Sequence, residues 1–492
     1  MENDKKKESK DNEKNISNEK IKKYKKSENF LKWYNFVVEN ARLADYSPIK
    51  GFMFILPYGY EIWENIKNIL DKKLKETGHR NAYAPALIPE HLLEKEKEHV
   101  KGFSPECFWV TLSGSNKLAE KLALRPTSET IIYHSYAKFI RSWRDLPLLL
   151  NFWNSVFRAE IKMTKLFIRT CEFLWQEGHT AHATEKEAEE EIRKIISIYR
   201  ELIEEYLAIP TLYGKKSESE KFPGAKETYT LEGLMPDGKA LQLGTVHNLA
   251  ENFAKVFGIK FLDKDEKKKF AWQTCWGVST RLIGAMLMVH GDDKGAIIPP
   301  RIAPIQVVII PIIYKGKEEA VIEKCKEIKK MLEDEFRVYL DDRKEYTPGW
   351  KFNDWELRGV PLRIEIGPKD IEKNKVTIVR RDSFERISVD EAMIKNIVRE
   401  KLEEIQSNLY KRAEKFLKDN IFLASDYNKF KKLIKKGFVK ACLCSSQSCE
   451  EKIKEETGAT IRLIPIDREE IFSNCIYCNK KAEIVAYFAR GY

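Results

Sequence analysis

The chain has 492 residues, 43% hydrophobic and 33% charged, which is too long for a single core and predicts about three soluble domains. No run reaches the roughly 18 consecutive apolar residues of a membrane span, and the amino terminus has no apolar signal core, so we expect a cytoplasmic protein. The formal net charge of +11 suits a polyanionic partner such as RNA, although a lysine-biased proteome would give the same excess.

The amino-terminal residues 1–26 form a distinct segment, with ten lysines against six acidic residues. A segment this polar cannot bury enough apolar surface to fold, so we expect a disordered extension. Its lysines could attract a nucleic acid weakly, or the extension could simply be solvated.

The folded part is predicted to begin near Ser27, as the N-cap of a helix that carries Leu31, Tyr34, Val38 and Ala41 on one face.

A second amphipathic helix follows, with Ile62, Ile66 and Ile69 on its apolar face and Gly78 at its end. A strand from Ala82 to Ile88 comes next, and Pro85 inside it indicates an edge or a bulge, where no ladder donor is missed. Further on, LALRPTSET at 122–130 places a Thr-Ser-Glu sequence before an apolar run, which favours a helix N-terminus.

The most informative stretch is NFWNSVFRAEIKMTKLFIRTCEFLWQEGHTAH, residues 151–182. Apolar and charged residues alternate on both sides of a basic loop, so we predict two antiparallel strands. The F-R-x-E sequence resembles motif 2 of the class II aminoacyl-tRNA synthetases, although alone it would also fit an ordinary hairpin with a cross-strand Arg–Glu pair. The longer string R-T-x-E-F-L-W-Q-E-G-H-T resembles the prolyl-tRNA synthetases of the archaeal and eukaryotic-like type.

This resemblance implies a site for ATP and L-proline. Arg158 would offer a two-pronged donor to the α-phosphate, which a lysine could not do, and Phe173 would lie against adenine. The resemblance adds further ATP-site residues, Glu160, Arg169 and Thr170. It implies that the proline pocket includes Arg158, Trp175, Glu177 and His179.

Two earlier segments gain a meaning from the same resemblance. Thr127 and Glu129 would hold the amino group of proline, because its secondary amine enters protonated and needs a carboxylate. The helix and proline-interrupted strand at 62–88 resemble class II motif 1, which in the family forms a dimer interface, so the resemblance implies a homodimer.

Two segments after residue 183 read as ordinary secondary structure. Thr184 and Glu187 form a capping box for a packing helix to which we assign no chemistry. GKALQLGTVHNLAENFAK, from Gly238, is typical of a strand, a glycine turn and a helix. The resemblance places Gln242 on a Mg²⁺ that bridges the phosphates, with Thr245 and His247 near ATP and proline; a lone histidine would otherwise more often be structural.

TCWGVSTRLIGAMLMVHGD, from Thr274, predicts a strand that ends at Gly277, a small-residue turn and a helix opened by Arg281. A helix N-terminus favours negative charge. The segment resembles class II motif 3, which implies that Arg281 binds the γ-phosphate beside Ser279 and Thr280. On this basis the catalytic residues would be Arg158, Glu160 and Arg281.

Three prolines then break the pattern, and we expect a domain boundary near Ala303. Strands alternating with helices over 303–404 predict an α/β domain. It resembles the class IIa anticodon-binding domain, and Glu356 and Arg363 match the positions that read two guanines of the proline anticodon. Without the resemblance, a surface ion pair would explain them.

The last region, 405–492, is marked by two close cysteine pairs, Cys444 with Cys449 and Cys475 with Cys478. Four thiolates spaced in this way suit a closed structural Zn²⁺ site, with Cys442 as a substitute ligand and a metal-free thiol cluster as the alternative. In the family a terminal tyrosine folds back toward the active site, which Tyr492 fits, although Gly491 replaces a bulkier residue.

We therefore expect an α+β class II catalytic domain at 27–302, an α/β anticodon-binding domain and a small α/β zinc-binding domain. The resemblance implies a proline–tRNA ligase that uses ATP, Mg²⁺ and tRNA(Pro). The segment between Phe173 and Gly277 leaves no room for the editing domain that bacterial-type enzymes insert there, so rejection of alanine would rest on the pocket, with a separate trans-editing protein as a possible partner. The alternatives are a threonyl-type class IIa enzyme, which would use zinc in its active site, and a non-catalytic paralogue that binds tRNA.

Overall fold

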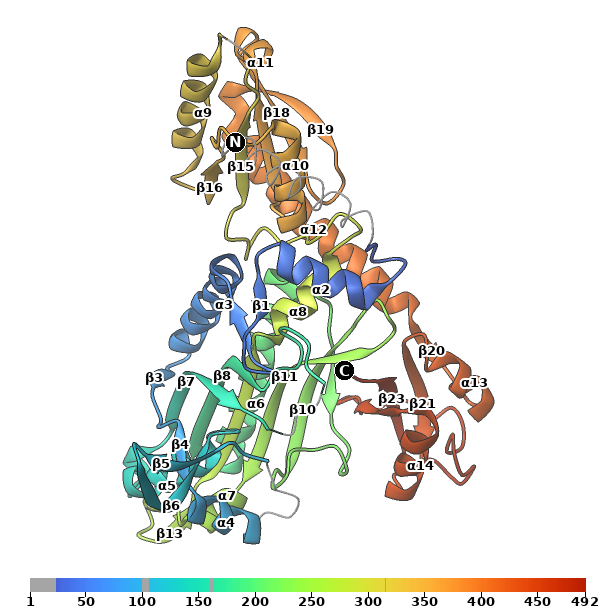
Figure 1. Cartoon of the computed structure of the whole chain (residues 1–492). Helices are drawn as coiled ribbons and strands as arrows, with labels where there is room; N and C mark the ends of the chain where they lie inside the picture. Colours follow the sequence, from blue (N-terminus) through green and yellow to red (C-terminus); the bar gives the residue numbers. More distant parts are fainter. Residues whose placement is uncertain (1–23, 100–105, 160–162, 315) are drawn as a thin grey trace.

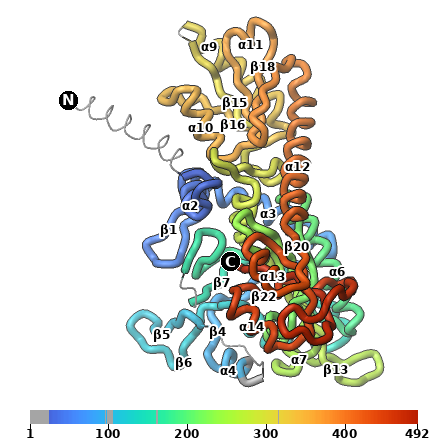
Figure 2. Tube along the Cα trace, turned by 90° about the vertical axis from the view of Figure 1, so that its right-hand side faces the viewer, coloured from blue at the N-terminus to red at the C-terminus, as the bar shows by residue number. Residues whose placement is uncertain are grey.

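The computed structural model describes residues 24–99, 106–159, 163–314 and 316–492. Three regions are arranged around one long helix, α12 (Ile394–Asp419), which runs from the upper domain down to the carboxy-terminal domain (Figures 1 and 2). The core region lies below the upper domain, and the carboxy-terminal domain lies beside the core. Among the described residues, no helix has the length and apolarity to span a membrane.

A seven-stranded sheet is the centre of the core region. It is antiparallel except where β3 pairs in parallel with β7. The predicted hairpin forms the pair β7–β8, whose register places Val156 opposite Phe173. The strand order is β3 (Arg80–Ala82), β7 (Leu148–Phe157), β8 (Glu172–His182), β14 (Trp272–Ser279), β11 (Ala240–Ala250), β10 (Glu227–Leu234), β9 (Leu212–Lys215).

Three helices bury their apolar faces in one large core with this sheet: α3 (Pro57–Glu76), α6 (Glu185–Glu201) with a π-helical turn after it (Leu202–Tyr206), and α8 (Arg281–His290). The predicted cap of α6 is confirmed, since the Thr184 side chain accepts a hydrogen bond from the Glu187 amide. The buried side chains Ile192, Ile195 and Tyr199 repeat at helical spacing, so α6 is a packing helix as expected.

A second apolar cluster lies at the lower edge of the core region. It contains the short helices and a small sheet around them. The elements are α4 (Glu90–His99), α5 (Glu129–Phe139), α7 (Asn252–Phe257), and the sheet of β4 (Leu87–Pro89), β6 (Asn116–Leu124) and β5 (Trp109–Ser113). Two hairpins, β1–β2 (Ala44–Tyr46, Met53–Ile55) and β12–β13 (Lys260–Leu262, Lys268–Phe270), and a 3₁₀ turn (Trp143–Asp145) complete the region.

The first helix, α2 (Phe30–Asn40), starts later than predicted. Its N-cap is Asn29, which accepts from the Lys32 amide, whereas Ser27 bonds to Asp293. Its buried face centres on Trp33 and Val37, and Leu31 is exposed, so the predicted face is partly wrong. The folded part includes residues 24–26; the rest of the predicted extension lies outside the described residues.

Two other local predictions are corrected. The single strand expected around Pro85 is two short strands, β3 and β4, in different sheets, because the proline cannot donate to a ladder. Gly244 is not a turn, since β11 runs through it. A Cβ there would lie 3.1 Å from a Val278 methyl carbon and 3.3 Å from the Tyr199 ring, so the glycine allows close packing instead.

The upper domain has a mixed five-stranded sheet with order β16 (Val338–Leu340), β15 (Val307–Pro311), β17 (Leu362–Ile366), β18 (Lys375–Arg380), β19 (Arg386–Asp390). Its helices are α9 (Glu318–Leu332), α10 (Pro348–Arg358) and α11 (Pro368–Glu372), with a 3₁₀ turn at Glu391–Met393. β15 is buried at every position, which explains why its sequence is a continuous apolar run.

The carboxy-terminal domain has a four-stranded sheet with order β20 (Ile421–Leu423), β21 (Phe438–Leu443), β23 (Ile484–Arg490), β22 (Ala459–Leu463), and helices α13 (Tyr427–Leu433) and α14 (Gln447–Thr457). It adjoins the edge of the core sheet, where Lys215 and Ile464 exchange backbone hydrogen bonds. The predicted boundary between 404 and 405 lies inside α12, which continues unbroken because its buried side chains pack first on the upper domain and then on the core.

Candidate active site

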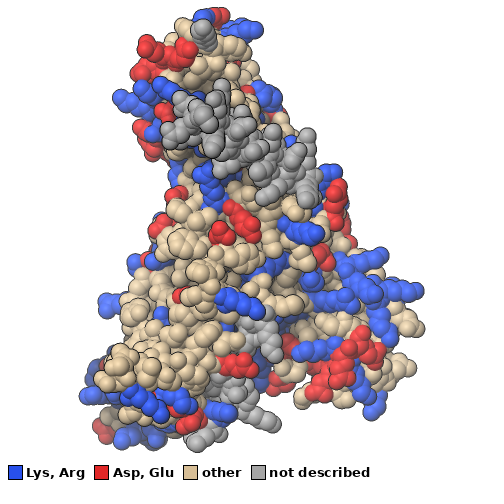
Figure 3. Space-filling model, viewed as in Figure 1, with Lys and Arg blue, Asp and Glu red and all other residues tan. Residues whose placement is uncertain are grey.

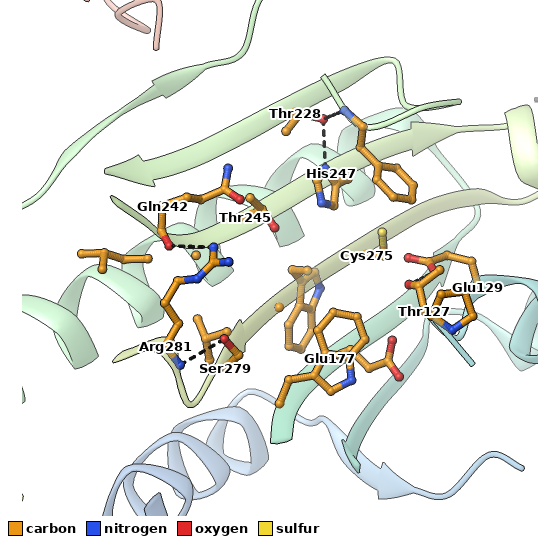
Figure 4. A pocket seen from close by; sticks show the side chains of 18 of the residues that line it. Thr127, Glu129, Glu177, Thr228, Gln242, Thr245, His247, Cys275, Ser279 and Arg281 are labelled. Carbon is orange, nitrogen blue, oxygen red and sulfur yellow. Dashed lines mark hydrogen bonds between the residues drawn. The ribbon is translucent and has the colours of Figure 1, made fainter. Parts of the chain in front are cut away.

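A cavity of about 500 Å³ opens over the central strands of the core sheet (Figure 4). Most of the sequence-predicted site residues meet in its wall: Thr127, Glu129, Arg158, Phe173, Trp175, Glu177, His179, Gln242, Thr245, His247, Ser279 and Arg281. Figure 4 shows Arg281 and Gln242 toward one end and Thr127 and Glu129 toward the other, so the two ends differ in charge.

Two guanidinium groups define the first end. Arg158 follows β7 directly, donates from Nε to the Pro126 carbonyl at 3.3 Å, and lies 5.2 Å from the Phe173 ring centre. Arg281 opens α8 and donates to the carbonyls of Ile168 and Gln242 at 3.2 and 3.4 Å. Burial, followed by the charge of Arg158, lowers the pKa of Arg281 to about 10. The two arginines repel each other, so this end is suited to an anion.

Two buried carboxylates define the other end. Glu129 opens α5 and accepts a short hydrogen bond from Thr127, which lies in the loop before it. Glu177 on β8 accepts from Ser128, and from Asn154 at 2.8 Å. Ser128 therefore fixes Glu177 instead of capping α5, where it makes no cap hydrogen bond.

His179 holds Glu177 from the same strand, with its Nε2 at 2.9 Å from the carboxylate and its Nδ1 at 3.0 Å from the Tyr133 hydroxyl. Burial alone would raise the pKa of Glu177, but the hydrogen bond and charge of His179, with Asn154 and Ser128, lower it below its usual value. The pKa of His179 is raised by Glu177 against the effect of burial. The pair therefore keeps a negative carboxylate in the pocket.

Trp175 and His247 shape the walls. The Trp175 indole donates to Asn154 at 2.5 Å, and the same asparagine donates to Glu177. His247 on β11 meets the Thr228 hydroxyl at 2.9 Å, and burial lowers its pKa to about 3, so this imidazole is neutral. Gln242 is half-buried and contacts Thr230 at 3.3 Å.

The structure does not place every predicted ATP-site residue in this wall. Thr170 is buried and donates to the Glu172 carbonyl at 2.6 Å, and the Thr280 hydroxyl is buried at the start of α8. Arg169 is exposed on the connecting loop, although its charge reaches Arg281. The prediction for Glu160 lies outside the described residues.

Several wall residues were missed from the sequence. Cys275 on β14 lies beside Glu129, and Phe222, before Pro223-Gly224, packs on His247 with ring centres 4.7 Å apart. No function was predicted for the segment around residues 222–224, and its Phe-Pro-Gly sequence is the signal that could have identified Phe222 as a wall residue. Trp276 reaches the site because it crosses Gly178, where a Cβ would lie 2.1 Å from its ring.

The predicted anticodon residues lie on α10 and β17 of the upper domain, which Figure 1 shows above the core region. Arg363 on β17 donates to Glu356 of α10 at 2.8 Å and to Glu365 at 3.0 Å, and its guanidinium lies 4.2 Å from the Phe352 ring. The two predicted residues therefore form an ion pair, and both are largely buried.

The four predicted zinc ligands, Cys444, Cys449, Cys475 and Cys478, have their sulfur atoms within 4.8 Å of one another. The Cys444 sulfur lies 3.7 Å from that of Cys449 and 3.6 Å from that of Cys478, close to the separation of about 3.8 Å that follows from tetrahedral Zn–S bonds of about 2.3 Å. A backbone hydrogen bond from Lys480 lowers the pKa of Cys478 to about 7. Cys442 instead packs with Ala482 and Val485, so it is no substitute ligand.

The carboxy terminus returns to the core beside the start of β11. The Tyr492 hydroxyl donates to Asp237 at 2.7 Å, and the ring lies 5.0 Å from the ammonium of Lys165, in the loop between β7 and β8. Burial lowers the pKa of Lys165 to about 8. Gly491 fits because a Cβ there would lie 2.8 Å from the Arg462 guanidinium.

Comparison with known families agrees with this arrangement. Residues 108–290 match the tRNA synthetase class II core domain (G, H, P, S and T), and 306–401 match the anticodon binding domain. The fold is that of a class II aminoacyl-tRNA synthetase.

The third match is narrower, since 427–492 correspond to the prolyl-tRNA synthetase C-terminal domain. The chain is 51% identical to a proline–tRNA ligase of Natranaerobius thermophilus, over 95% of this chain and 97% of that protein. It is 52% identical to a proline–tRNA ligase of Cenarchaeum symbiosum, over 95% and 98%. The chain belongs to the proline–tRNA ligase family.

Proposed function

We propose that this enzyme activates L-proline with ATP and transfers it to the 3′ end of tRNA(Pro). The observation that carries the proposal is the charge distribution of one cavity: Arg281, close to Arg158, lies toward one end, and Glu129, which shares the neighbour His179 with Glu177, lies toward the other. Such a cavity fits a polyphosphate beside a protonated amine. The near-full-length similarity to proline–tRNA ligases gives the amino acid and the tRNA.

In the first step, a proline carboxylate oxygen attacks the α-phosphorus of ATP, and the bond to the β-phosphate oxygen breaks, giving prolyl-adenylate and pyrophosphate. Arg158 would meet the charge on the α-phosphate and Arg281 the charge on the γ-phosphate. Thr127 and Glu129 would hold the ammonium so that the carboxylate is in line. Catalysis then consists of positioning and charge stabilisation, without a protein nucleophile.

In the second step, a terminal ribose hydroxyl of tRNA attacks the carbonyl carbon of prolyl-adenylate, and AMP leaves.

Mg²⁺ would neutralise the pyrophosphate that forms in the first step, and Gln242, whose amide lines the cavity, is the side chain we assign to it. Phe173 would stack on adenine, with Thr245 and Ser279 beside the nucleotide. Trp175, His179 and His247 would form the walls around the proline ring.

We propose that tRNA(Pro) spans the cavity and the upper domain, with Glu356 and Arg363 reading two anticodon guanines. An exposed basic surface on the carboxy-terminal domain supports polyanion binding: Lys and Arg gather over α13 and the turn after it (Figure 3), where Lys429, Lys432, Lys435 and Lys436 are exposed. We assign a structural Zn²⁺ to the four-cysteine cluster, because its sulfur spacing fits that ion.

We also propose three finer properties. The domains are a catalytic domain at 27–302, an anticodon-binding domain at 303–404 and a zinc-binding domain at 405–492, with α12 shared between the last two.

The enzyme is a cytoplasmic homodimer, and exposed apolar side chains such as Tyr83, beside the motif 1 strands, support the dimer. It is of the archaeal and eukaryotic-like type and relies on a separate trans-editing protein, because every strand between β8 and β14 belongs to the core sheet or to the short hairpin β12–β13.

Pyrophosphate exchange tests the function directly. We expect ATP–pyrophosphate exchange that depends on proline and is much weaker with the other nineteen amino acids. A threonyl-type enzyme would respond to threonine, and a non-catalytic paralogue to no amino acid. Either result would contradict the proposal.

A further inference from the structure

Three different metal-binding side chains converge at the carboxylate end of the cavity. Glu129, His179 and Cys275 come from the start of α5, from β8 and from β14. One ligand atom of each lies within 4.8 Å of the other two, and all three side chains are buried. Figure 4 shows the Cys275 side chain close to the Glu129 carboxylate. This is a second cluster of donors, separate from the four cysteines near the carboxy terminus.

The donor types match the protein ligands of an open Zn²⁺ site: one imidazole, one thiolate and one carboxylate, with a fourth position left for a small ligand. Tetrahedral bonds of about 2.0 to 2.3 Å place ligand atoms about 3.3 to 3.8 Å apart, so donors within 4.8 Å need to move little. The three elements that carry them are fixed by a well-packed core, which holds the donors together in advance.

The surroundings of His179 complete the arrangement. Glu177 meets its Nε2 at 2.9 Å, which leaves Nδ1 toward the Tyr133 hydroxyl, 3.0 Å away. A carboxylate on one imidazole nitrogen is how proteins orient a histidine whose other nitrogen binds a metal. Binding would displace the tyrosine hydroxyl from Nδ1 and release to solvent the proton of the Cys275 thiol and any proton on Nδ1, since a thiolate and an unprotonated imidazole nitrogen are the ligands.

We propose that Glu129, His179 and Cys275 bind a divalent, thiol-seeking metal ion of the Zn²⁺ type, and that this ion inhibits the enzyme by occupying the place of the substrate ammonium. The identity of the competing substrate rests on the proposed function. The metal site itself does not, because it depends only on the three donors.

The test begins with enzyme whose four-cysteine cluster is already filled with Zn²⁺. Co²⁺ is then titrated in, and the bound metal is counted together with the thiolate-to-metal absorption band. We expect one further ion for the wild type and for the control Cys325→Ala, a buried cysteine in the upper domain. Cys275→Ala should bind no further ion. A wild type without the extra ion, or a Cys275→Ala variant that keeps it, would overturn the proposal.

Two additional measurements keep the outcomes separate. Glu129→Gln keeps the side-chain shape and should weaken binding of the extra ion at least about tenfold. This variant supplies a test even if Cys275→Ala folds poorly, and unchanged binding in it would also overturn the proposal. Added Zn²⁺ should raise the KM for proline in pyrophosphate exchange without changing kcat, and proline should displace Co²⁺. If the extra ion binds but proline does not displace it, the metal site stands and the assignment of this pocket to proline fails.

Discussion

The arginines of the cavity and the arginine of the upper domain are held in opposite ways. Arg281 donates to two backbone carbonyls, and burial, followed by the charge of Arg158, lowers its pKa. Arg363 instead lies between two carboxylates, those of Glu356 and Glu365. The charge with the largest effect on Arg281 is therefore another arginine, whereas Arg363 is paired with carboxylates.

This difference has a physical consequence for binding. Carbonyl acceptors orient the Arg281 guanidinium without neutralising it, so on the proposed function Arg281 is organised in advance for phosphate, and little rearrangement is needed when charge builds in the transition state. If Arg363 reads a guanine as proposed, it must exchange a carboxylate for the base, which reduces the net gain in binding free energy but penalises a wrong base that leaves charges unpaired. On this proposal the cavity serves the rate of the reaction and the upper domain serves the selection of the tRNA.

The largest effect is expected from Arg158→Ala. Loss of one pre-organised charged donor should reduce proline-dependent pyrophosphate exchange by about 10² to 10³, or about 3 to 4 kcal/mol, at an unchanged melting temperature. Arg158→Lys keeps the charge but not the two-pronged geometry, so its exchange rate should fall between those of the wild type and Arg158→Ala. Exchange within tenfold of the wild type in the alanine variant would refute the role of Arg158.

Removal of the zinc ligands should lower the stability of the protein more than the activity per folded molecule. Cys475→Ser with Cys478→Ser should lower the melting temperature by several degrees and reduce bound zinc from one ion per chain to none, because metal binding contributes directly to folding. Activity per folded molecule should fall less. Elemental analysis that finds no metal in freshly purified wild type would contradict the assignment, and Cys442→Ser, outside the cluster, is the matched control.

Activity with alanine tests the amino-acid end of the cavity. A missing methylene in an apolar pocket is worth only about 1 to 3 kcal/mol, so the ring carbons that alanine lacks cannot ensure its exclusion. We expect measurable alanine-dependent exchange and an Ala-tRNA that persists until a separate editing protein is added. Rapid deacylation of Ala-tRNA by the purified enzyme alone would contradict the proposed absence of an editing domain.

The upper domain should separate the two reactions. Glu356→Ala or Arg363→Ala should lower aminoacylation by about 10- to 100-fold, corresponding to about 1 to 3 kcal/mol for a lost base contact, and leave pyrophosphate exchange unchanged. Arg386→Ala, an exposed neighbour that also pairs with Glu365, should change neither. Equal losses in both assays would indicate a folding defect instead of lost recognition.

The smallest effect is expected at the carboxy terminus. Tyr492→Ala removes the ring beside Lys165 and the hydrogen bond to Asp237, which together contribute about 1 kcal/mol to the position of the loop after β7. The KM for ATP should rise about two- to fivefold at an unchanged KM for proline. Tyr492→Phe keeps the ring and should change less; a larger effect on proline than on ATP would exclude a role limited to this loop.

The sequence by itself determined the order of elements and most of the wall of the cavity. The alternation around Arg158 and Glu177 specified a strand pair, and the spacing of Ile192, Ile195 and Tyr199 specified a helix, because side-chain direction follows backbone period. The resemblance could be carried over residue by residue because these positions are close along the chain.

Tertiary structure decided the features that depend on residues far apart in sequence. Cys275 comes to lie next to His179 only when β14 pairs with β8. The Glu356–Arg363 ion pair forms only when α10 packs beside β17. Ser128 bonds to Glu177 instead of capping its own helix, and Gly244 extends a strand instead of turning, because packing against Val278 and Tyr199 outweighs the local preference of glycine. Local pattern fixes backbone period, whereas the partner of each buried polar group depends on which strands become neighbours.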